Sequence, residues 1–116
     1  MPILINPNEM IVQKGNGWVE IILADENAVG VPAIAAHRWS FKPNTRGPQQ
    51  THSGVDQLLY VIAGGGAAIV GGERLPLEKE SVLWLEPDDS YHFEAGPDGM
   101  EILQGYPPET RVWNPL

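Results

Sequence analysis

Glycine and proline divide this sequence into short apolar runs. Of its 116 residues, 13 are Gly and 11 are Pro, and both types disfavour the interior of a helix. Long helices are therefore not expected. The apolar runs have the length of strands, and turn-forming residues lie between them. The runs are residues 18–24, 33–41, 58–62, 67–70, 82–85, 91–93 and 100–103. This pattern predicts an all-β sandwich or barrel.

Three glycine-containing segments are predicted to be turns between these strands. Residues 64–66 and 96–99 each separate two apolar runs. Gly71 and Gly72 join residues 67–70 to residues 73–77 in a predicted hairpin, because two glycines readily adopt the positive φ that a two-residue turn requires.

Length and composition predict one domain that spans residues 1–116. A content of 42% hydrophobic residues is enough for a core. Seven Lys and Arg against 15 Asp and Glu give a net charge of −8, which disfavours nucleic acid and anionic membranes as partners. No apolar run is long enough for a signal peptide or a membrane span. The absence of Cys excludes disulfides and thiol chemistry and fits a cytoplasmic location.

Basic residues gather in one acid-free segment of the chain. Arg38, Lys42 and Arg46 lie between Glu26 and Asp56 with no acid among them. Such a group is commonly a solvated surface. It can also attract a small anion toward a nearby site, and on this basis Arg38 is a candidate substrate-binding residue.

A second group of residues is predicted to converge on one centre. Gln50 and His52 share a face if they lie on a strand. Ser53 and Gly54 then permit a turn or bulge, after which Gln57 can return to the same centre. Forty residues after His52, another turn leads into His92.

These segments resemble the two motifs of the cupin superfamily. The first motif is His-x-His, then Glu, then Gly, and the residues at its positions are Gln50, His52, Gln57 and Gly64. The second motif is Pro-x-Gly-x-x-His, then Asn, and the residues at its positions are Pro87, Asp89, His92 and Gly96. The resemblance covers about residues 33–107. It implies a small antiparallel β-barrel of the cupin, or jelly-roll, type that is commonly a homodimer.

Cupins often hold a divalent metal ion between the two motifs. The resemblance therefore implies that an ion such as Zn, Ni, Mn or Fe is bound by Gln50, His52, Gln57 and His92. Two imidazoles and two amides are neutral, so they would leave the charge of the ion uncompensated. Such an ion polarises a bound carbonyl strongly and attracts an anionic ligand.

Several nearby residues are candidates for further roles in such a site. Glu94 shares the face of His92 on a regular strand, so it is a candidate catalytic acid or base, although a solvated carboxylate is the simpler role. Tyr60 is a candidate substrate-binding residue. His37 is the one other histidine that can complete a site, and its ordinary role is packing beside Trp39. Aromatic residues that can line a cavity, or fill the core and a dimer interface instead, are Tyr60, Trp84, Tyr91 and Tyr106.

Three functions are consistent with these residues. The first is a metal-dependent isomerase or lyase that acts on a small oxygenated or anionic metabolite by Lewis-acid polarisation of a carbonyl. The second is a metal-dependent dioxygenase. The third is a non-catalytic, metal-free barrel that binds a small molecule through hydrogen bonds from its glutamines and histidines.

Overall fold

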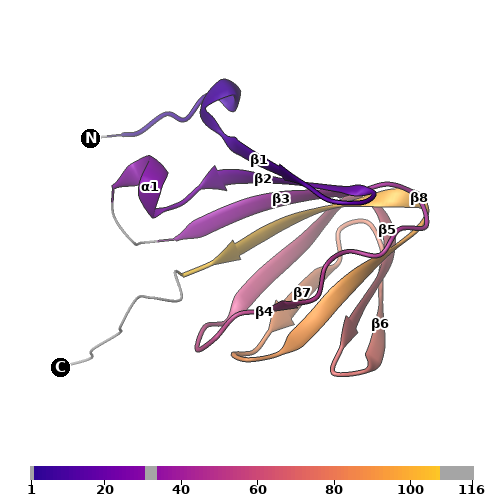
Figure 1. The fold of residues 1–116 in the computed structure, drawn as a ribbon. Coiled ribbons are helices and arrows are strands. Elements are labelled where there is room, and N and C mark those ends of the chain that lie inside the picture. Colours follow the sequence, from indigo (N-terminus) through magenta and orange to yellow (C-terminus); the bar gives the residue numbers. More distant parts are fainter. Residues whose placement is uncertain (1, 31–33, 108–116) are drawn as a thin grey trace.

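The computed structural model describes residues 2–30 and 34–107 of the chain. In this part, the helical elements are one 3-10 turn, Pro7–Glu9, and one short helix, α1 (Glu26–Val29). The strands are β1 (Ile11–Lys14), β2 (Trp18–Ala24), β3 (Ala35–Phe41), β4 (Gln50–Thr51), β5 (Gln57–Val70), β6 (Glu73–Leu77), β7 (Val82–Leu85) and β8 (Ser90–Tyr106). Every strand pairing is antiparallel, so the predicted all-β antiparallel fold is confirmed (Figure 1).

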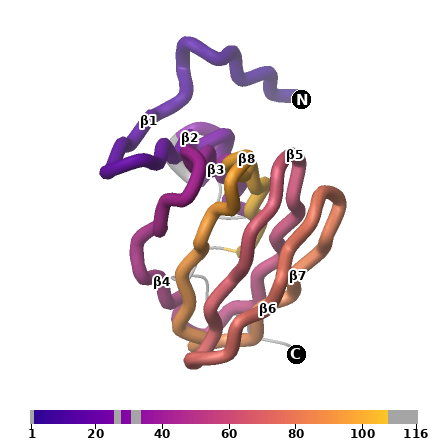
Figure 2. The backbone as a smooth tube through the Cα atoms, turned by 90° about the vertical axis from the view of Figure 1, so that its right-hand side faces the viewer, coloured from indigo at the N-terminus to yellow at the C-terminus, as the bar shows by residue number. Residues whose placement is uncertain are grey.

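The long strands β5 and β8 organise the sheet. Its order is β1-β2-β3-β8-β5-β6, with β4 also paired to β8 and β7 to β5. The first half of β5 pairs with the second half of β8, as in Leu58 with Gly105, and the second half of β5 pairs with the first half of β8, as in Val70 with Tyr91. Both long strands therefore run through two parts of the sheet, which curve around one core (Figure 2).

The glycines at residues 64–66 and 96–99 lie within these long strands. They were predicted to be turns between separate strands, and this prediction is wrong. A Cβ atom on Gly66 would lie 2.0 Å from the carbonyl oxygen of Glu94, and one on Gly64 would lie 2.1 Å from that of Gly99. Glycine is thus required because the two backbones approach too closely for a side chain, and the paired strands continue through this contact.

The predicted hairpin and several predicted strands are confirmed. Gly71 and Gly72 join β5 to β6 with φ values of 56° and 85°, as a two-residue turn requires. The strands β2 and β7 have the predicted bounds. By contrast, β1 was not indicated by the apolar pattern, because all four of its residues are exposed.

The core is rich in aromatic residues. Phe41 packs against both Trp39 and Phe93, and Tyr91 packs against Phe93, with ring centroids 5.5 to 6.0 Å apart. The buried polar residues Gln57 and Gln104 lie on β5 and β8, the same strands that contribute to this core. Among the described residues, no helix is long and apolar enough to cross a membrane.

We expect Gly66→Ala to lower the free energy of unfolding by about 1–3 kcal/mol, because the new Cβ atom forces the β8 backbone away. Gly105→Ala is the matched control, since it also lies in a paired strand and its Cβ atom would meet nothing closer than the oxygen of Ala35 at 4.0 Å. Urea denaturation of both variants measures the difference. Equal losses would show that the close crossing of β5 and β8 does not limit stability.

Candidate functional site

A network of polar side chains lies inside the barrel next to the aromatic core. The hydroxyl oxygen of Tyr91 is 3.0 Å from Gln57 Oε1 and 3.2 Å from Gln50 Oε1. Gln104 Nε2 donates to Gln57 Oε1 and to the Tyr91 oxygen, and Trp39 Nε1 donates to Gln104 Oε1 at 2.7 Å. We call these five residues the amide network.

The amide network is buried and neutral. Gln57, Tyr91 and Gln104 are each 2% exposed or less. Burial raises the pKa of Tyr91, because its phenolate would lose its hydration. The phenol therefore stays protonated and acts as a hydrogen-bond donor. Among the described residues, one buried donor of the network, Gln50 Nε2, lacks a hydrogen-bond partner, so it suits an oxygen atom of a ligand.

Cross-strand pairing aligns this network with His37. Gln104 on β8 pairs with His37 on β3 and with Leu59 on β5, and directly paired residues share a face of the sheet. Gln57, two residues before Leu59, shares that face by alternation. The three strands therefore present polar side chains in one row.

A second group of side chains continues from this row as a chain of hydrogen bonds. His37 Nδ1 lies 2.6 Å from Glu20 Oε2, and His37 Nε2 lies 3.2 Å from the Tyr106 hydroxyl. The ring of His52 packs edge-on against Tyr106, with centroids 4.5 Å apart, and lies 6.3 Å from that of Tyr91. We call Glu20, His37 and Tyr106 the proton relay. His52 stands between the relay and the amide network.

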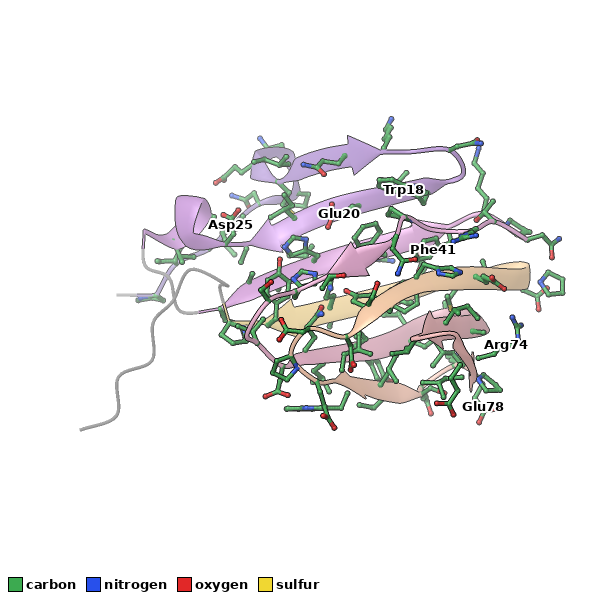
Figure 3. All side chains as sticks on the ribbon, turned by 60° about the horizontal axis from the view of Figure 1, so that its bottom comes forward. Trp18, Glu20, Asp25, Phe41, Arg74 and Glu78 are labelled. Atoms are coloured by element: carbon green, nitrogen blue, oxygen red, sulfur yellow. The ribbon has the colours of Figure 1, made fainter. Side chains whose placement is uncertain are left out.

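In the proton relay, the Glu20 carboxylate contacts the His37 imidazole, which in turn contacts the Tyr106 phenol. An ionised Glu20 accepts a hydrogen bond from His37 Nδ1–H, which leaves Nε2 as an acceptor for the Tyr106 hydroxyl. If Tyr106 gives its proton to His37, the resulting imidazolium lies beside the Glu20 carboxylate and is stabilised by it. Figure 3 shows Glu20 on β2, the strand next to β3. The arrangement is suited to general acid–base chemistry.

The structure places Gln50 and Gln57 at the Tyr91 hydroxyl and the His52 ring 6.3 Å from that of Tyr91, whereas His92 lies apart from them. Along β8, Tyr91 points to the amide network, so alternation directs His92 to the opposite face. There, His92 Nδ1 lies 3.2 Å from Gln49 Oε1. The cupin motif assigns a metal-binding position to His92, but the side chain that reaches the interior is that of the preceding residue, Tyr91.

Glu94 lies with His92 on this opposite face. Its oxygens are 3.2 Å from His92 Nε2 and 2.9 Å from Arg74 Nη1. Hydrogen bonds from His92 and then from Arg74 hold the pKa of Glu94 below its ordinary value. A depression of about 290 Å³ adjoins His92, and its walls include Gln49 and Ser90. Glu94 therefore belongs to a surface cluster and not to the interior site.

The two candidate substrate-binding residues also face outward. The guanidinium of Arg38 forms an ion pair with Glu101 at 2.9 Å, and its side chain is 42% exposed. Tyr60 is 37% exposed and pairs with Leu103 on the outer face of β5 and β8. Neither residue lines the amide network.

As arranged, the interior residues do not form a ligand set for a divalent metal ion. The amide oxygen of Gln57 accepts two hydrogen bonds, and that of Gln50 faces the Tyr91 hydroxyl. A neutral phenol with a raised pKa is a poor ligand, because coordination requires deprotonation. Within residues 2–30 and 34–107, there is no group of three or more His, Cys, Asp or Glu side chains that is placed to hold an ion.

Two interior residues were not identified from the sequence. Glu20 is the one charged residue of an apolar strand, and Gln104 directly follows the apolar run of residues 100–103. Both are buried, at 9% and 1% exposure. A single polar residue at an inward position of an apolar strand is the signal that indicates such residues.

No protein-family model matches the chain, and no curated protein sequence matches it. Solved structures do. KdgF from Halomonas sp. is 23% identical with a TM-score of 0.69, over 92% of this chain and 94% of that one. An RmlC-like cupin from Shewanella frigidimarina is 16% identical with a TM-score of 0.74, over 93% and 92%. The Streptomyces nucleoside dehydratase Pac13 is 15% identical with a TM-score of 0.76, over 93% and 83%.

The chain therefore has the cupin fold, as the resemblance of its motifs implied. At these identities, the similarity establishes the fold alone. The interior site must accordingly be interpreted from the residues that this chain itself places there.

We expect Zn, Ni, Mn and Fe ions to leave the melting temperature of the protein unchanged, because the interior amide oxygens are already engaged. Thermal unfolding of chelator-free protein, with and without each ion, measures this. In the variant Gln50→His/Gln57→Glu/Tyr91→His, imidazole and carboxylate donors surround the same centre, so the same ions should raise the melting temperature. A rise in the unaltered protein would instead establish the metal site predicted from the sequence.

Proposed function

We propose that this cupin is an isomerase or lyase that transfers a proton on a small oxygenated metabolite inside its barrel, without a resident metal ion. The observation that carries the proposal is the hydrogen-bonded sequence of Glu20, His37 and Tyr106 next to His52. A buried carboxylate and imidazole behind a phenol make that phenol oxygen a better base.

The amide network supplies the binding groups in this proposal. Gln50 Nε2 donates to a carbonyl or hydroxyl oxygen of the substrate, since it has no other acceptor among the described residues. The hydrogen bonds among Gln57, Tyr91 and Gln104 hold this wall of the site rigid. A neutral, hydrogen-bonding wall of this kind favours a hydroxylated substrate.

Proton transfer begins at Tyr106. Its oxygen takes a proton from a carbon next to the substrate carbonyl, while its own proton passes to His37 Nε2. If one proton returns to the former carbonyl carbon while the proton of the neighbouring hydroxyl moves to the former carbonyl oxygen, the product is an isomer with its carbonyl on the next carbon. If the C–O bond of a neighbouring hydroxyl breaks instead, the hydroxyl leaves with that proton as water and a C=C bond remains, which is a lyase reaction. His37 Nε2 holds this proton and returns it through the Tyr106 hydroxyl to which it is hydrogen-bonded, so that Glu20, His37 and Tyr106 regain their starting states.

The structural comparison supports the lyase form of the proposal. Pac13 is a nucleoside dehydratase, and dehydration removes water in the manner just described. The two proteins share a fold, and in this chain the residues proposed to perform the reaction are those of the proton relay.

A non-catalytic binding barrel is the second candidate function. The observation that favours it is the neutral amide network, which can bind a polar molecule without any chemical step. In this case, a ligand would bind with no dependence on the proton relay.

We expect the protein to exchange a carbon-bound proton of at least one compound in a panel of hydroxy-aldehydes, hydroxy-ketones and hydroxy-acids. Proton NMR in D₂O measures this exchange. Tyr106→Phe should reduce the rate by about 10²–10⁴-fold, because general acid–base catalysis contributes that much.

Tyr60→Phe is the matched control, since Tyr60 faces outward, and it should retain the full rate. Full exchange in Tyr106→Phe would exclude the proton relay as the catalytic group. Binding of a panel compound without exchange in the unaltered protein would support the non-catalytic barrel.

We also propose that the chain forms a homodimer through the outer face of β5, β7 and β8. Large apolar side chains are exposed there, from 37% at Tyr60 to 62% at Val82 and Trp84. Register pairs Tyr60 with Val82 on one side and with Leu103 on the other, so these side chains form one continuous patch. Exposed apolar patches of this kind mark association surfaces.

We expect light scattering to give twice the mass of one chain for the unaltered protein, and the mass of one chain for Val82→Glu, because a buried carboxylate opposes association. Val12→Glu is the control, since Val12 is also exposed but lies on β1 at the far edge of the sheet. A monomeric unaltered protein would contradict the dimer.

A further inference from the structure

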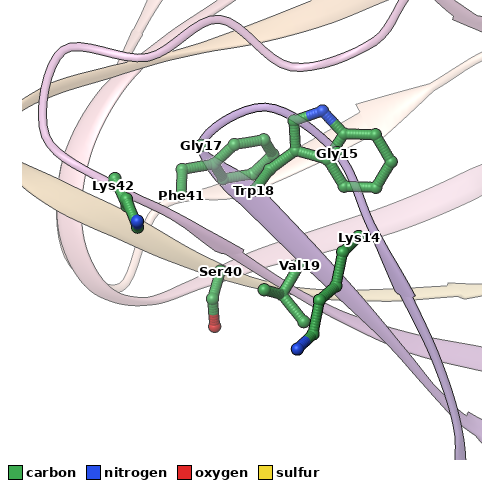
Figure 4. Close-up of a pocket in the computed structure, with 8 residues that line it drawn as sticks. All are labelled: Lys14, Gly15, Gly17, Trp18, Val19, Ser40, Phe41 and Lys42. Atoms are coloured by element: carbon green, nitrogen blue, oxygen red, sulfur yellow. The ribbon is translucent and has the colours of Figure 1, made fainter.

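A pocket of about 420 Å³ lies outside the barrel interior, where the turn between β1 and β2 meets the end of β3 (Figure 4). Its lining includes Lys14, Gly15, Trp18, Phe41 and Lys42. This volume is in the range of pockets that hold small molecules. None of these residues belongs to the proton relay or the amide network, so the pocket is separate from the site of the proposed function.

Lys14 and Lys42 give the pocket a local positive charge, because the Glu101 carboxylate that accepts a hydrogen bond from Ser40 in the lining is itself paired with Arg38. Within the part of the chain that the structure describes, ion pairs bring carboxylates to Arg38 and Arg74, whereas no carboxylate pairs with Lys14 or Lys42. The net charge of the chain is −8. Two ammonium groups in the lining of one pocket create a local attraction for an anion.

Trp18 and Phe41 form an aromatic part of the pocket lining, beside Val19 and Ser40. The indole ring of Trp18 lies directly over the hairpin backbone, since a Cβ atom on Gly15 would be 2.0 Å from its Cε2 atom. Inside the molecule, Trp18 packs against Trp39, with ring centroids 5.3 Å apart. Phe41 is 5% exposed and belongs to the core. The aromatic part of the lining is therefore held in place by the core.

Backbone hydrogen bonds hold the pocket in its shape. Lys42 N–H donates to Gly17 O at 2.9 Å, which ties the hairpin turn to the end of β3. Gly15 N–H donates to Trp18 O at 3.0 Å, which closes the turn itself. Gly17 has a φ of 85°, in the region that favours glycine. A pocket formed before the ligand arrives loses little entropy on binding.

We propose that this pocket binds a small organic anion whose phosphate or carboxylate group contacts Lys14 and Lys42 and whose planar ring packs on Trp18. The charge of the lysines selects the anionic group. The part of the half-buried Trp18 indole that lines the pocket selects the ring. Neither feature alone distinguishes this pocket from other surface positions, but the combination predicts that both parts of the ligand are required.

The test uses four probes and protein labelled with ¹⁵N. Phenyl phosphate and benzoate carry both a ring and a charge, inorganic phosphate lacks the ring, and benzyl alcohol lacks the charge. We expect the two ring-bearing anions to shift the amide signals of Gly15 and Gly17 and the indole signal of Trp18, with higher affinity than inorganic phosphate or benzyl alcohol. Whichever of phenyl phosphate and benzoate binds with higher affinity shows whether the pocket prefers a phosphate or a carboxylate group.

Two variants complete the test. Lys14→Gln/Lys42→Gln should weaken binding of the preferred anion by about tenfold, which is the effect of losing two exposed ion pairs. Lys79→Gln, an exposed lysine outside the pocket, should leave the affinity unchanged. Equal weakening by both variants, or shifts produced equally by all four probes, would overturn the proposal. The readout does not depend on proton exchange, so its failure leaves the proposed function untouched.

Discussion

The close crossing of β5 and β8 is the constraint on which the rest of the structure depends. At Gly66, the carbonyl oxygen of Glu94 occupies the place of a Cβ atom. The two strands can therefore bend together while their pairing continues on both sides of the bend. Each long strand then contributes to both parts of the barrel, and the aromatic core fills the space between them. Without glycine at this contact, the strands would have to separate.

This crossing also decides which side chains reach the interior. The register of β8 on β5 decides which side chains of β8 point inward. In the observed register, Tyr91 points inward and His92 points outward. A shift of one residue would exchange them. Because Tyr91 points inward, the interior holds a phenol among amides, and the imidazole of His92 joins Gln49 and Glu94 on the other face.

The interior site combines rigidity with the capacity for proton transfer. The amide network has no ionised group, and its hydrogen bonds offset the cost of burying every donor except Gln50 Nε2, which has no partner among the described residues. The proton relay places its one carboxylate, Glu20, at the far end, where an imidazole screens it from the phenol. The negative charge of Glu20 therefore acts on the Tyr106 phenol through His37 and does not itself line the interior site. This separation is what the proposed acid–base function requires.

The sequence by itself determined the strand content and the hairpin at Gly71 and Gly72, because these depend on local turn preferences, and the resemblance of its two motifs indicated the cupin fold. Only the tertiary structure decided that residues 64–66 bend one strand and that Tyr91 replaces His92 in the interior. It also joined Glu20 to Tyr106, which lie far apart in the chain. The reason is physical: alternation specifies two faces for every strand, but the pairing between distant strands specifies which face is inside.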